Sequence, residues 1–295
     1  MGSPDRRTGS HNKGREGEDV ALKLIHLTDT HMVPKGRTLF GRDPRVPLDA
    51  AIADINAHQG DAELLVLTGD LTHWGAPKAF EHLAEALAPL TVPIRLLIGN
   101  HDDREAYRQA FPFEHFDSDG FAQSALDVSA GRFLFLDTVR DGSHAGIYCE
   151  RRQRWLKEEL ERAAGRDTYL FMHHPPFITG LPAMDRIGLK NRDEFRAVVE
   201  PFRHQIRHLF FGHLHRPIAG SWLGIPMSTV RSMNHQTAFS LEDGTSIPGN
   251  FEPPAYCVVL IEADRVVVHF HDFLDRSERF FLDASPWDDD SREPG

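Results

Sequence analysis

Short apolar runs alternate with amphipathic patterns over the first two-thirds of the chain. Each run is dense in Leu, Ile, Val or Phe, which is typical of strands covered on both faces. Six such runs predict strands, at residues 22–27, 63–67, 94–98, 132–136, 168–172 and 208–211. Strands that alternate with helical patterns predict an α/β fold.

Apolar residues spaced three or four positions apart predict helices between these strands, and we assign their apolar faces to core packing. Four stripes begin with Leu48, Phe80, Trp155 and Phe195. The last stripe runs from Phe195 to Ile206, and Asn191 with Glu194 ahead of it forms a capping-box pattern.

The pattern changes after residue 216. Strand-like pieces follow one another without helices and predict a second, more antiparallel sheet, at 217–222, 225–230, 256–262 and 265–273. The segment 231–255 is rich in Gly, Pro, Ser and Asn, which predicts a long loop or lid near an active site. Residues 1–19 and 284–295 are polar and predict disordered tails around one domain of 20–283.

Composition excludes several classes of protein. Apolar residues make up 40% and charged residues 26% of the 295 positions, which is ordinary for a globular chain. A formal net charge of −11 disfavours a nucleic acid polymer as partner. Two cysteines, no apolar run of about 20 residues and a polar N-terminus predict a cytoplasmic protein without a membrane segment. The 18 histidines are unusually many and suggest metal binding.

Candidate ligands follow the predicted strands where each strand ends. In an open α/β sheet the carboxyl ends of the strands form the ligand-binding edge. A single Asp-x-His or His-Pro pair is a weak signal, whereas five groups in order are a strong one. Five predicted strands are each followed by Asp, Asn or His residues. In chain order these are Asp29 and His31; Asp70; Asn100 with His101; His173; and His213 with His215.

The motifs DTH, GD, GNHD, MHHPP and GHLH, in this order, resemble those of the calcineurin-like metallophosphoesterases over about residues 22–273. This resemblance implies a four-layer αββα sandwich of two mixed β-sheets flanked by helices, with a dinuclear metal centre. Within the superfamily, the chain is most similar to class III cyclic-nucleotide phosphodiesterases and to related bacterial glycerophosphodiesterases. LIHLTDTH, IGNHDDR, FMHHPP and Met184-Asp185 carry that closer likeness.

The resemblance also implies two sets of metal ligands that share Asp70. One set is Asp29, His31, Asp70 and His215, and the other is Asp70, Asn100, His173 and His213. Two divalent ions are therefore expected as cofactors. Imidazole and carboxylate ligands suit Fe, Mn, Zn or Co, among which the sequence does not choose.

His101 is expected to face the substrate, together with Asn100, and to contact the phosphoryl oxygens or protonate the leaving alkoxide. The alternative is a structural histidine. Asp70 and His101 are thus the predicted catalytic residues, with His73 and His235 as further candidate substrate contacts.

The remaining candidates near the motifs have structural interpretations. His174 is expected to be structural, and Asp102 to orient a neighbour or to cap the following helix. Arg231 is either a phosphate contact or a solvated charge. Histidines that match no motif, His144 among them, are assigned to the surface or the core.

The resemblance implies hydrolysis of a small anionic phosphodiester by a metal-bound hydroxide, with 3′,5′-cyclic nucleotides such as cAMP and glycerophosphodiesters as candidate substrates. A metal-dependent phosphomonoesterase, a nuclease and a non-enzymatic scaffold are the alternatives. The sequences GDLTHWG and GNHD lack the Arg and Glu of phosphoprotein phosphatases, which disfavours that activity. A homo-oligomer is possible, and the oligomeric state is left open.

Overall fold

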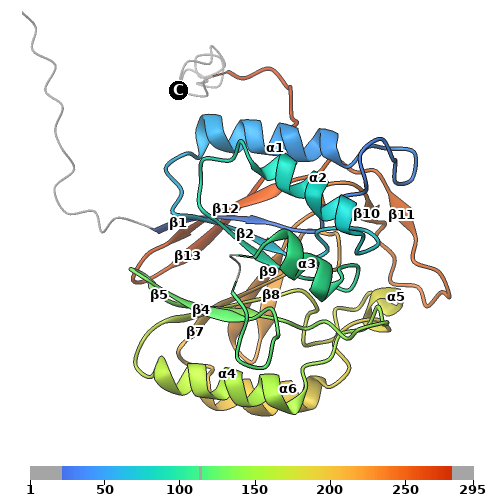
Figure 1. The fold of residues 1–295 in the computed structure, drawn as a ribbon. Coiled ribbons are helices and arrows are strands. Elements are labelled where there is room, and N and C mark those ends of the chain that lie inside the picture. The colour runs from blue at the N-terminus through green and yellow to red at the C-terminus, as the bar shows by residue number, and fades with distance from the viewer. Residues whose placement is uncertain (1–21, 113–114, 281–295) are drawn as a thin grey trace, which may run out of the picture.

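Two β-sheets lie face to face between two layers of helices (Figure 1), in a computed structural model that describes residues 22–112 and 115–280. This arrangement confirms the predicted four-layer sandwich of two mixed sheets. The predicted tails at 1–19 and 284–295 lie outside the described residues.

The first sheet has five strands in the order β13-β12-β1-β2-β3. Its parallel part consists of β1 (Leu22–Leu27), β2 (Leu64–Thr68) and β3 (Ile94–Leu97). β12 (Tyr256–Ile261) and β13 (Val266–His271) extend this part as an antiparallel hairpin beside β1.

The second sheet has six strands in the order β4-β5-β6-β7-β9-β8. Its four central strands are parallel: β5 (Gly131–Leu136), β6 (Thr168–Met172), β7 (Ile206–Phe211) and β9 (Ile225–Thr229). The two antiparallel edge strands are β4 (Ser124–Val128) and β8 (Ile218–Trp222).

The prediction of a separate sheet after residue 216 is therefore wrong. β8 and β9 continue the sheet that contains β7, whereas β12 and β13 join the sheet that contains β1. The chain crosses between the sheets through the segment 231–255, which contains the short strands β10 (Gln236–Thr237) and β11 (Gly249–Asn250). Local sequence cannot show this, because strand partners are chosen by long-range pairing.

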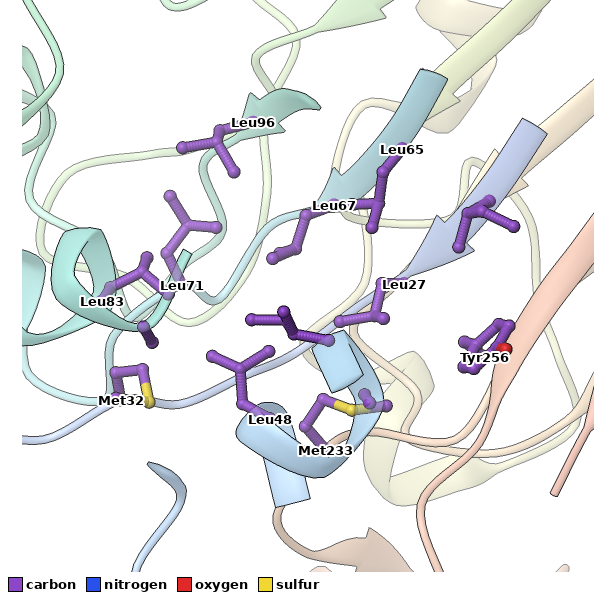
Figure 2. Packing of buried hydrophobic residues seen from close by; sticks show 14 of the residues in the cluster. Leu27, Met32, Leu48, Leu65, Leu67, Leu71, Leu83, Leu96, Met233 and Tyr256 are labelled. Atoms are coloured by element: carbon purple, nitrogen blue, oxygen red, sulfur yellow. The ribbon is translucent and has the colours of Figure 1, made fainter. Parts of the chain in front are cut away.

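Successive side chains of a strand point to opposite faces of the sheet, so the two sheets have three apolar cores: one under each helix layer and one between the sheets. On β1, Ile25 faces the core beneath the helices while Leu24 faces the core between the sheets. Figure 2 shows the first of these cores, which contains Leu48 of α1, Leu83 of α2 and Leu65 of β2. The helices of this layer are α1 (Arg45–His58), α2 (Pro77–Leu87) and α3 (Arg104–Ala110).

The opposite layer contains α4 (Glu150–Arg162), the short α5 (Pro182–Asp185) and α6 (Arg192–Val199). The predicted stripe from Phe195 to Ile206 is not one helix. α6 ends at Val199, because Pro201 in the following 3-10 turn lacks an N–H, and Ile206 already belongs to β7.

The predicted capping box before α6 is also wrong. The Asn191 side chain accepts a hydrogen bond from the Tyr148 amide at 2.9 Å and donates one to the Tyr148 carbonyl at 2.7 Å. Both polar groups of the amide side chain are thus used to hold the preceding loop. No side-chain capping bond forms at this helix start.

Candidate metal centre

Backbone strain concentrates where the predicted ligands lie. Seven non-glycine residues of the described structure have a positive φ, and five of them are predicted ligands: Asp29 at 54°, His31 at 46°, Asp70 at 48°, His213 at 69° and His215 at 50°. A left-handed backbone costs such residues about 1–3 kcal/mol each, and such strain clusters at functional sites. The loops after β1, β2 and β7 therefore keep a conformation that is unfavourable for the local backbone.

The first predicted ligand set forms one compact, buried cluster. Ligand atoms of Asp29, His31, Asp70 and His215 all lie within 4.8 Å of one another. The Nε2 atoms of His31 and His215 are 3.0 Å apart, and His215 Nε2 lies 3.2 Å from Asp29 Oδ1. Asp70 Oδ2 is 3.6 Å from His31 Nε2. Two imidazoles and two carboxylates thus converge on a common point.

The second set lies on the other side of Asp70. The same Oδ2 atom is 3.3 Å from His173 Nε2, which in turn lies 3.2 Å from Asn100 Oδ1. The His173 and His213 rings are 5.2 Å apart between centroids. Asp70 therefore stands between the two sets, as a bridging ligand must.

Backbone carbonyls fix which nitrogen of two ligand histidines carries the proton. His173 Nδ1 lies 2.8 Å from the Thr68 carbonyl oxygen, and His215 Nδ1 lies 2.8 Å from the His235 carbonyl oxygen. A carbonyl only accepts, so each Nδ1 must donate. Nε2 is then the atom of each ring that faces the centre, which is the arrangement found in metal-ligating histidines.

Two glycines let the chain pack against the bridging carboxylate. Gly69 has φ of +93°, which suits glycine, and a Cβ there would lie 2.6 Å from His173 Nδ1. A Cβ on Gly99 would lie 2.2 Å from Asp70 Oδ1. Any other residue at either position would displace Asp70 or His173, so both glycines are required by close approach.

The electrostatics of the centre favour bound cations. Although burial opposes it, the carboxylate of Asp70 raises the pKa of His173 to about 9, and Asp29 raises the pKa of His215. Burial lowers the pKa of His31 and of His213, which keeps these imidazoles neutral. The two carboxylates stabilise positive charge on the neighbouring imidazoles, and they would stabilise a bound cation in the same way.

The donors present fit two divalent ions. His213 Nε2 is buried and has no hydrogen-bond partner among the described residues, although a buried nitrogen normally has one. A cation beside it would satisfy its lone pair. Nitrogen and oxygen donors without thiolate match Zn, Mn, Fe or Co better than a soft thiophilic metal. Geometry thus supports the predicted cofactors without choosing between these metals.

The predicted substrate residues surround this centre. His101 donates from Nδ1 to the His73 carbonyl at 2.8 Å, and the His101 amide donates to Asp70 Oδ1 at 2.9 Å. The His101 and His73 rings stack at 4.7 Å. His235 lies 4.9 Å from His31 and 4.7 Å from His215 between ring centroids. Burial lowers the pKa of His73 to about 4 and of His235 to about 3, so both are neutral near pH 7.

The neighbouring candidates have structural contacts. His174 is buried, with Nδ1 2.8 Å from the Thr138 hydroxyl. Asp102 does not cap α3, because Asp103 accepts the bond from the Ala106 amide at 2.7 Å. Asp102 instead accepts from the amides of Leu71, Thr72 and Gly99 and from the Thr72 hydroxyl. It therefore ties the loop that carries Asp70 to the loop that carries Asn100.

The guanidinium of Arg231 pairs with Asp272, and Arg231 is not among the described residues that line the cavity over the centre. This contact favours neither the phosphate-contact nor the free solvated-charge interpretation. The side chain joins the segment after β9 to the end of the first sheet.

A cavity of about 840 Å³ opens over the centre, and its lining includes seven histidines. One of them, His144, was assigned to the surface or the core from the sequence. Its Nδ1 atom instead lies 3.3 Å from the side-chain Nδ2 of Asn100, and its ring centroid lies 5.2 Å from that of His101. It sits eight residues beyond the end of β5, outside any motif. The apolar lining was also missed: Phe40, Met184 and Ile187, with Ile247 and Phe251 beside β11. Residues of the predicted loop 231–255 thus line the cavity.

None of the described helices is long and apolar enough to cross a membrane. Among the described residues lining the cavity there is no arginine or lysine. Positive charge for an anionic ligand would therefore come from bound cations and not from side chains.

Comparison with known proteins gives matches over most of the chain. Residues 22–217 match the family model described as calcineurin-like phosphoesterase. A protein named probable cyclic nucleotide phosphodiesterase from Rhodopseudomonas palustris is 44% identical over 267 residues, covering 90% of this chain and 97% of that protein. The 3′,5′-cyclic adenosine monophosphate phosphodiesterase of Escherichia coli is 30% identical, covering 78% and 84%. A dimetal phosphatase from Danio rerio shares the fold, with a TM-score of 0.66 at 14% identity over 87% and 98% of the two chains.

Proposed function

The chain belongs to the calcineurin-like phosphoesterase family, and on that premise we propose that it is a metal-dependent phosphodiesterase acting on small anionic diesters. The candidate substrates are 3′,5′-cyclic nucleotides and glycerophosphodiesters. The observation that carries the proposal is the position of Asp70 Oδ2, 3.6 Å from His31 Nε2 and 3.3 Å from His173 Nε2. One carboxylate oxygen between two ligand sets is the arrangement that a dinuclear centre needs.

In this proposal each ligand set holds one ion. Asp29, His31, Asp70 and His215 hold the first, and Asp70, Asn100, His173 and His213 hold the second. Divalent ions bound by these residues would orient the phosphate, withdraw charge from its oxygens and lower the pKa of water so that a nucleophile is available at neutral pH.

The chain's own side chains complete the chemistry. His101 donates its Nδ1 proton to the His73 carbonyl, so its Nε2 is the atom free to exchange a proton with the leaving alkoxide. Asn100 lies at the boundary between ligand set and cavity, where it can contact the phosphoryl group. His73 and His235 line the same cavity and, being neutral, offer hydrogen bonds and not charge.

A phosphomonoesterase and a nuclease are the alternatives within this fold. A dianionic monoester gains from arginine forks, and the described lining contains neither arginine nor lysine. A net charge of −11 opposes a polyanionic substrate. The set of buried donors around Asp70 argues against a scaffold without activity. These features favour a small, singly charged diester.

The test is a panel of rates after loading with Mn²⁺, Co²⁺ or Zn²⁺. It compares cAMP, a glycerophosphodiester, bis(p-nitrophenyl) phosphate and p-nitrophenyl phosphate. We expect kcat/KM for the artificial diester to exceed that of the matching monoester by at least about tenfold, or ~1.4 kcal/mol. Equal or faster hydrolysis of the monoester would overturn the diesterase assignment. Asp70→Asn serves as the inactive control for contaminating phosphatases.

A further inference from the structure

Phe40 occupies a turn position that ordinarily takes asparagine or glycine. The amide of Leu39 donates to the Arg42 carbonyl at 2.8 Å, and the amide of Arg42 donates back at 3.1 Å. Between them, Phe40 and Gly41 have φ of 51° and 77°, the signs required by a type I′ turn. A bulky residue at the first of these positions is strained. The Phe40 side chain is 62% exposed, so core packing does not offset this strain.

The exposed ring stands beside the metal centre. Phe40 lines the cavity, and its ring centroid lies 4.8 Å from that of His235 and 6.2 Å from that of His73. Both contacts are edge-to-face. The strained turn therefore presents an aromatic ring next to two candidate substrate contacts, and strain of this kind points to a functional role.

The same turn also holds a second aromatic residue of the cavity. The guanidinium carbon of Arg42 lies 3.8 Å from the ring centroid of Phe251, which is 41% exposed. Phe251 follows β11, and Ile247, 46% exposed, precedes it. Two segments far apart in the sequence thus bring exposed apolar side chains to the cavity that is also lined by candidate ligands of the metal centre.

We propose that Phe40 and Phe251 form an aromatic wall that stacks on the nucleobase of a cyclic nucleotide. This inference rests on the proposed function and narrows its substrate class to diesters that carry a planar aromatic group. Stacking of one base on an aromatic side chain is worth about 5- to 150-fold in affinity. A glycerophosphodiester has no planar group and would gain nothing from the wall.

The wall should not distinguish adenine from guanine. Gln236 exchanges hydrogen bonds with the backbone of Ser232 at 2.8 and 2.9 Å, and Asn250 bonds the side chain and amide of Glu252 at 3.0 and 3.2 Å. These two polar side chains of β10 and β11, which line the cavity, are therefore already engaged. Stacking tolerates any base because every base has a π face, so cAMP and cGMP should be used about equally.

The experiment measures kcat/KM of the metal-loaded protein and of Phe40→Ala on cAMP, cGMP and glycerophosphoethanolamine. We expect Phe40→Ala to lose about 5- to 150-fold on both cyclic nucleotides, mainly through KM, and to stay within about twofold on glycerophosphoethanolamine. Phe40→Trp should retain activity. Phe239→Ala is the matched control, since Phe239 is 66% exposed and is outside the cavity lining. It should change none of the three rates.

An equal loss of kcat/KM on all three diesters, or no loss on the cyclic nucleotides, would overturn the proposal of an aromatic wall. A wild-type protein that hydrolyses none of them would overturn the proposed function instead. The wall is then tested by calorimetry, in which Phe40→Ala should weaken binding of AMP and leave binding of glycerol 3-phosphate unchanged. Equal effects on these two ligands would again overturn it.

A stability measurement separates strain from folding defects. Phe40→Asn places a residue that tolerates a left-handed backbone at the turn, so Tm should rise by about 2 °C. The same variant should lose cyclic nucleotide hydrolysis as Phe40→Ala does. A variant that is less stable than the parent would show that the ring supports the fold, which would overturn the wall.

Discussion

The Nε2 atoms of His31 and His215 lie 3.0 Å apart in the first ligand cluster. His215 Nδ1 donates to the His235 carbonyl, so Nε2 is the atom of this ring that faces His31. Asp29 Oδ1 and Asp70 Oδ2 face the same point from 3.2 and 3.6 Å. Nitrogen and carboxylate oxygen atoms that converge in this way would be stabilised by a cation between them.

This geometry predicts that divalent metal stabilises the fold. After treatment with a chelator, Mn²⁺, Co²⁺ or Zn²⁺ at 100 times the dissociation constant should contribute about 2.7 kcal/mol per site, measured as a rise in Tm. Asp70→Asn should lose most of that rise and at least about 10²-fold in kcat. The exposed Asp141→Asn should respond to metal as the parent does. An unchanged Tm in the parent would contradict the metal centre.

We expect substitution of Asp102, which is not a candidate metal ligand, to lower both stability and metal affinity. Its two oxygens accept four hydrogen bonds, at 2.8 to 2.9 Å, from the loops that carry Asp70 and Asn100. Asp102→Asn would turn an amide N–H toward donors, so we expect a loss of about 1–3 kcal/mol in unfolding free energy and about 10- to 100-fold in metal affinity. Chemical denaturation and metal titration measure these two quantities.

The adjacent Asp103 is the matched control for that substitution. Asp103 caps α3 by accepting from the Ala106 amide at 2.7 Å, and asparagine is an equally good cap. Asp103→Asn should therefore change neither quantity by a measurable amount. Equal effects of the two substitutions would show that Asp102 has no special role in positioning the ligand loops.

We expect substitution of the buried Asp137 to lower the stability of the fold by a large amount. Its buried carboxylate lies 2.9 Å from Arg104 Nε and 3.3 Å from the buried Arg152 Nη1. Asp137→Ala leaves Arg152 without its carboxylate, which should cost about 3–5 kcal/mol in unfolding free energy. Asp141 binds the same Arg104 at 2.8 Å but is 80% exposed, so Asp141→Ala should cost only about 0–1 kcal/mol. Similar costs for both would contradict the burial argument.

Much of the fold and of the clustering of the candidate ligands could be predicted because local sequence determines them. The parallel strands β1, β2, β3, β6 and β7 are apolar runs, and a candidate ligand follows each within a few residues, as with Asp29 after β1 or His173 after β6. The edge of the sheet then gathers residues that are far apart in the chain. This is why the clusters around Asp70 could be expected before any coordinates.

The parts that failed depend on contacts that the sequence does not display. β12 lies beside β1 through pairs such as Ile25 with Val258, and nothing in either strand names its partner. His144 and Phe40 reach the cavity from loops with no motif and no periodicity. The strand β4 was missed because SALDV is only partly buried and has no clear alternation.

We expect substitution of His101 to lower kcat without lowering the metal content of the protein. Its Nδ1 is engaged with the His73 carbonyl and its Nε2 is the free atom beside the centre. His101→Ala should lower kcat by about 10²- to 10⁴-fold for an alkyl leaving group while metal content, measured by mass spectrometry, stays at the parent value. The deficit should shrink for p-nitrophenolate, which needs no acid. An unchanged kcat with the alkyl leaving group would leave His101 a structural role.

The last prediction concerns a buried chain of hydroxyl groups behind Asp29. His26 Nε2 lies 2.9 Å from the Thr68 hydroxyl, which donates to the Thr28 hydroxyl at 2.8 Å, and Thr28 donates to Asp29 Oδ2 at 2.6 Å. Such contacts orient a ligand, and their loss typically costs 10- to 100-fold in metal affinity. Thr28→Val should therefore weaken metal binding by about that factor in a calorimetric titration.

Thr30→Val separates this effect from the loss of any buried hydroxyl on the same loop. Thr30 is also buried, but its hydroxyl donates to the Leu71 carbonyl at 2.7 Å and not to a carboxylate. Both variants should lose about 0.5–1.5 kcal/mol in unfolding free energy, since each removes buried hydrogen bonds whose partners keep another one, as the Leu71 carbonyl keeps the Met32 amide and Asp29 Oδ2 keeps the His213 amide. Only Thr28→Val should also weaken metal affinity. If the two variants bind metal equally well, the hydroxyl chain supports the fold and does not position Asp29.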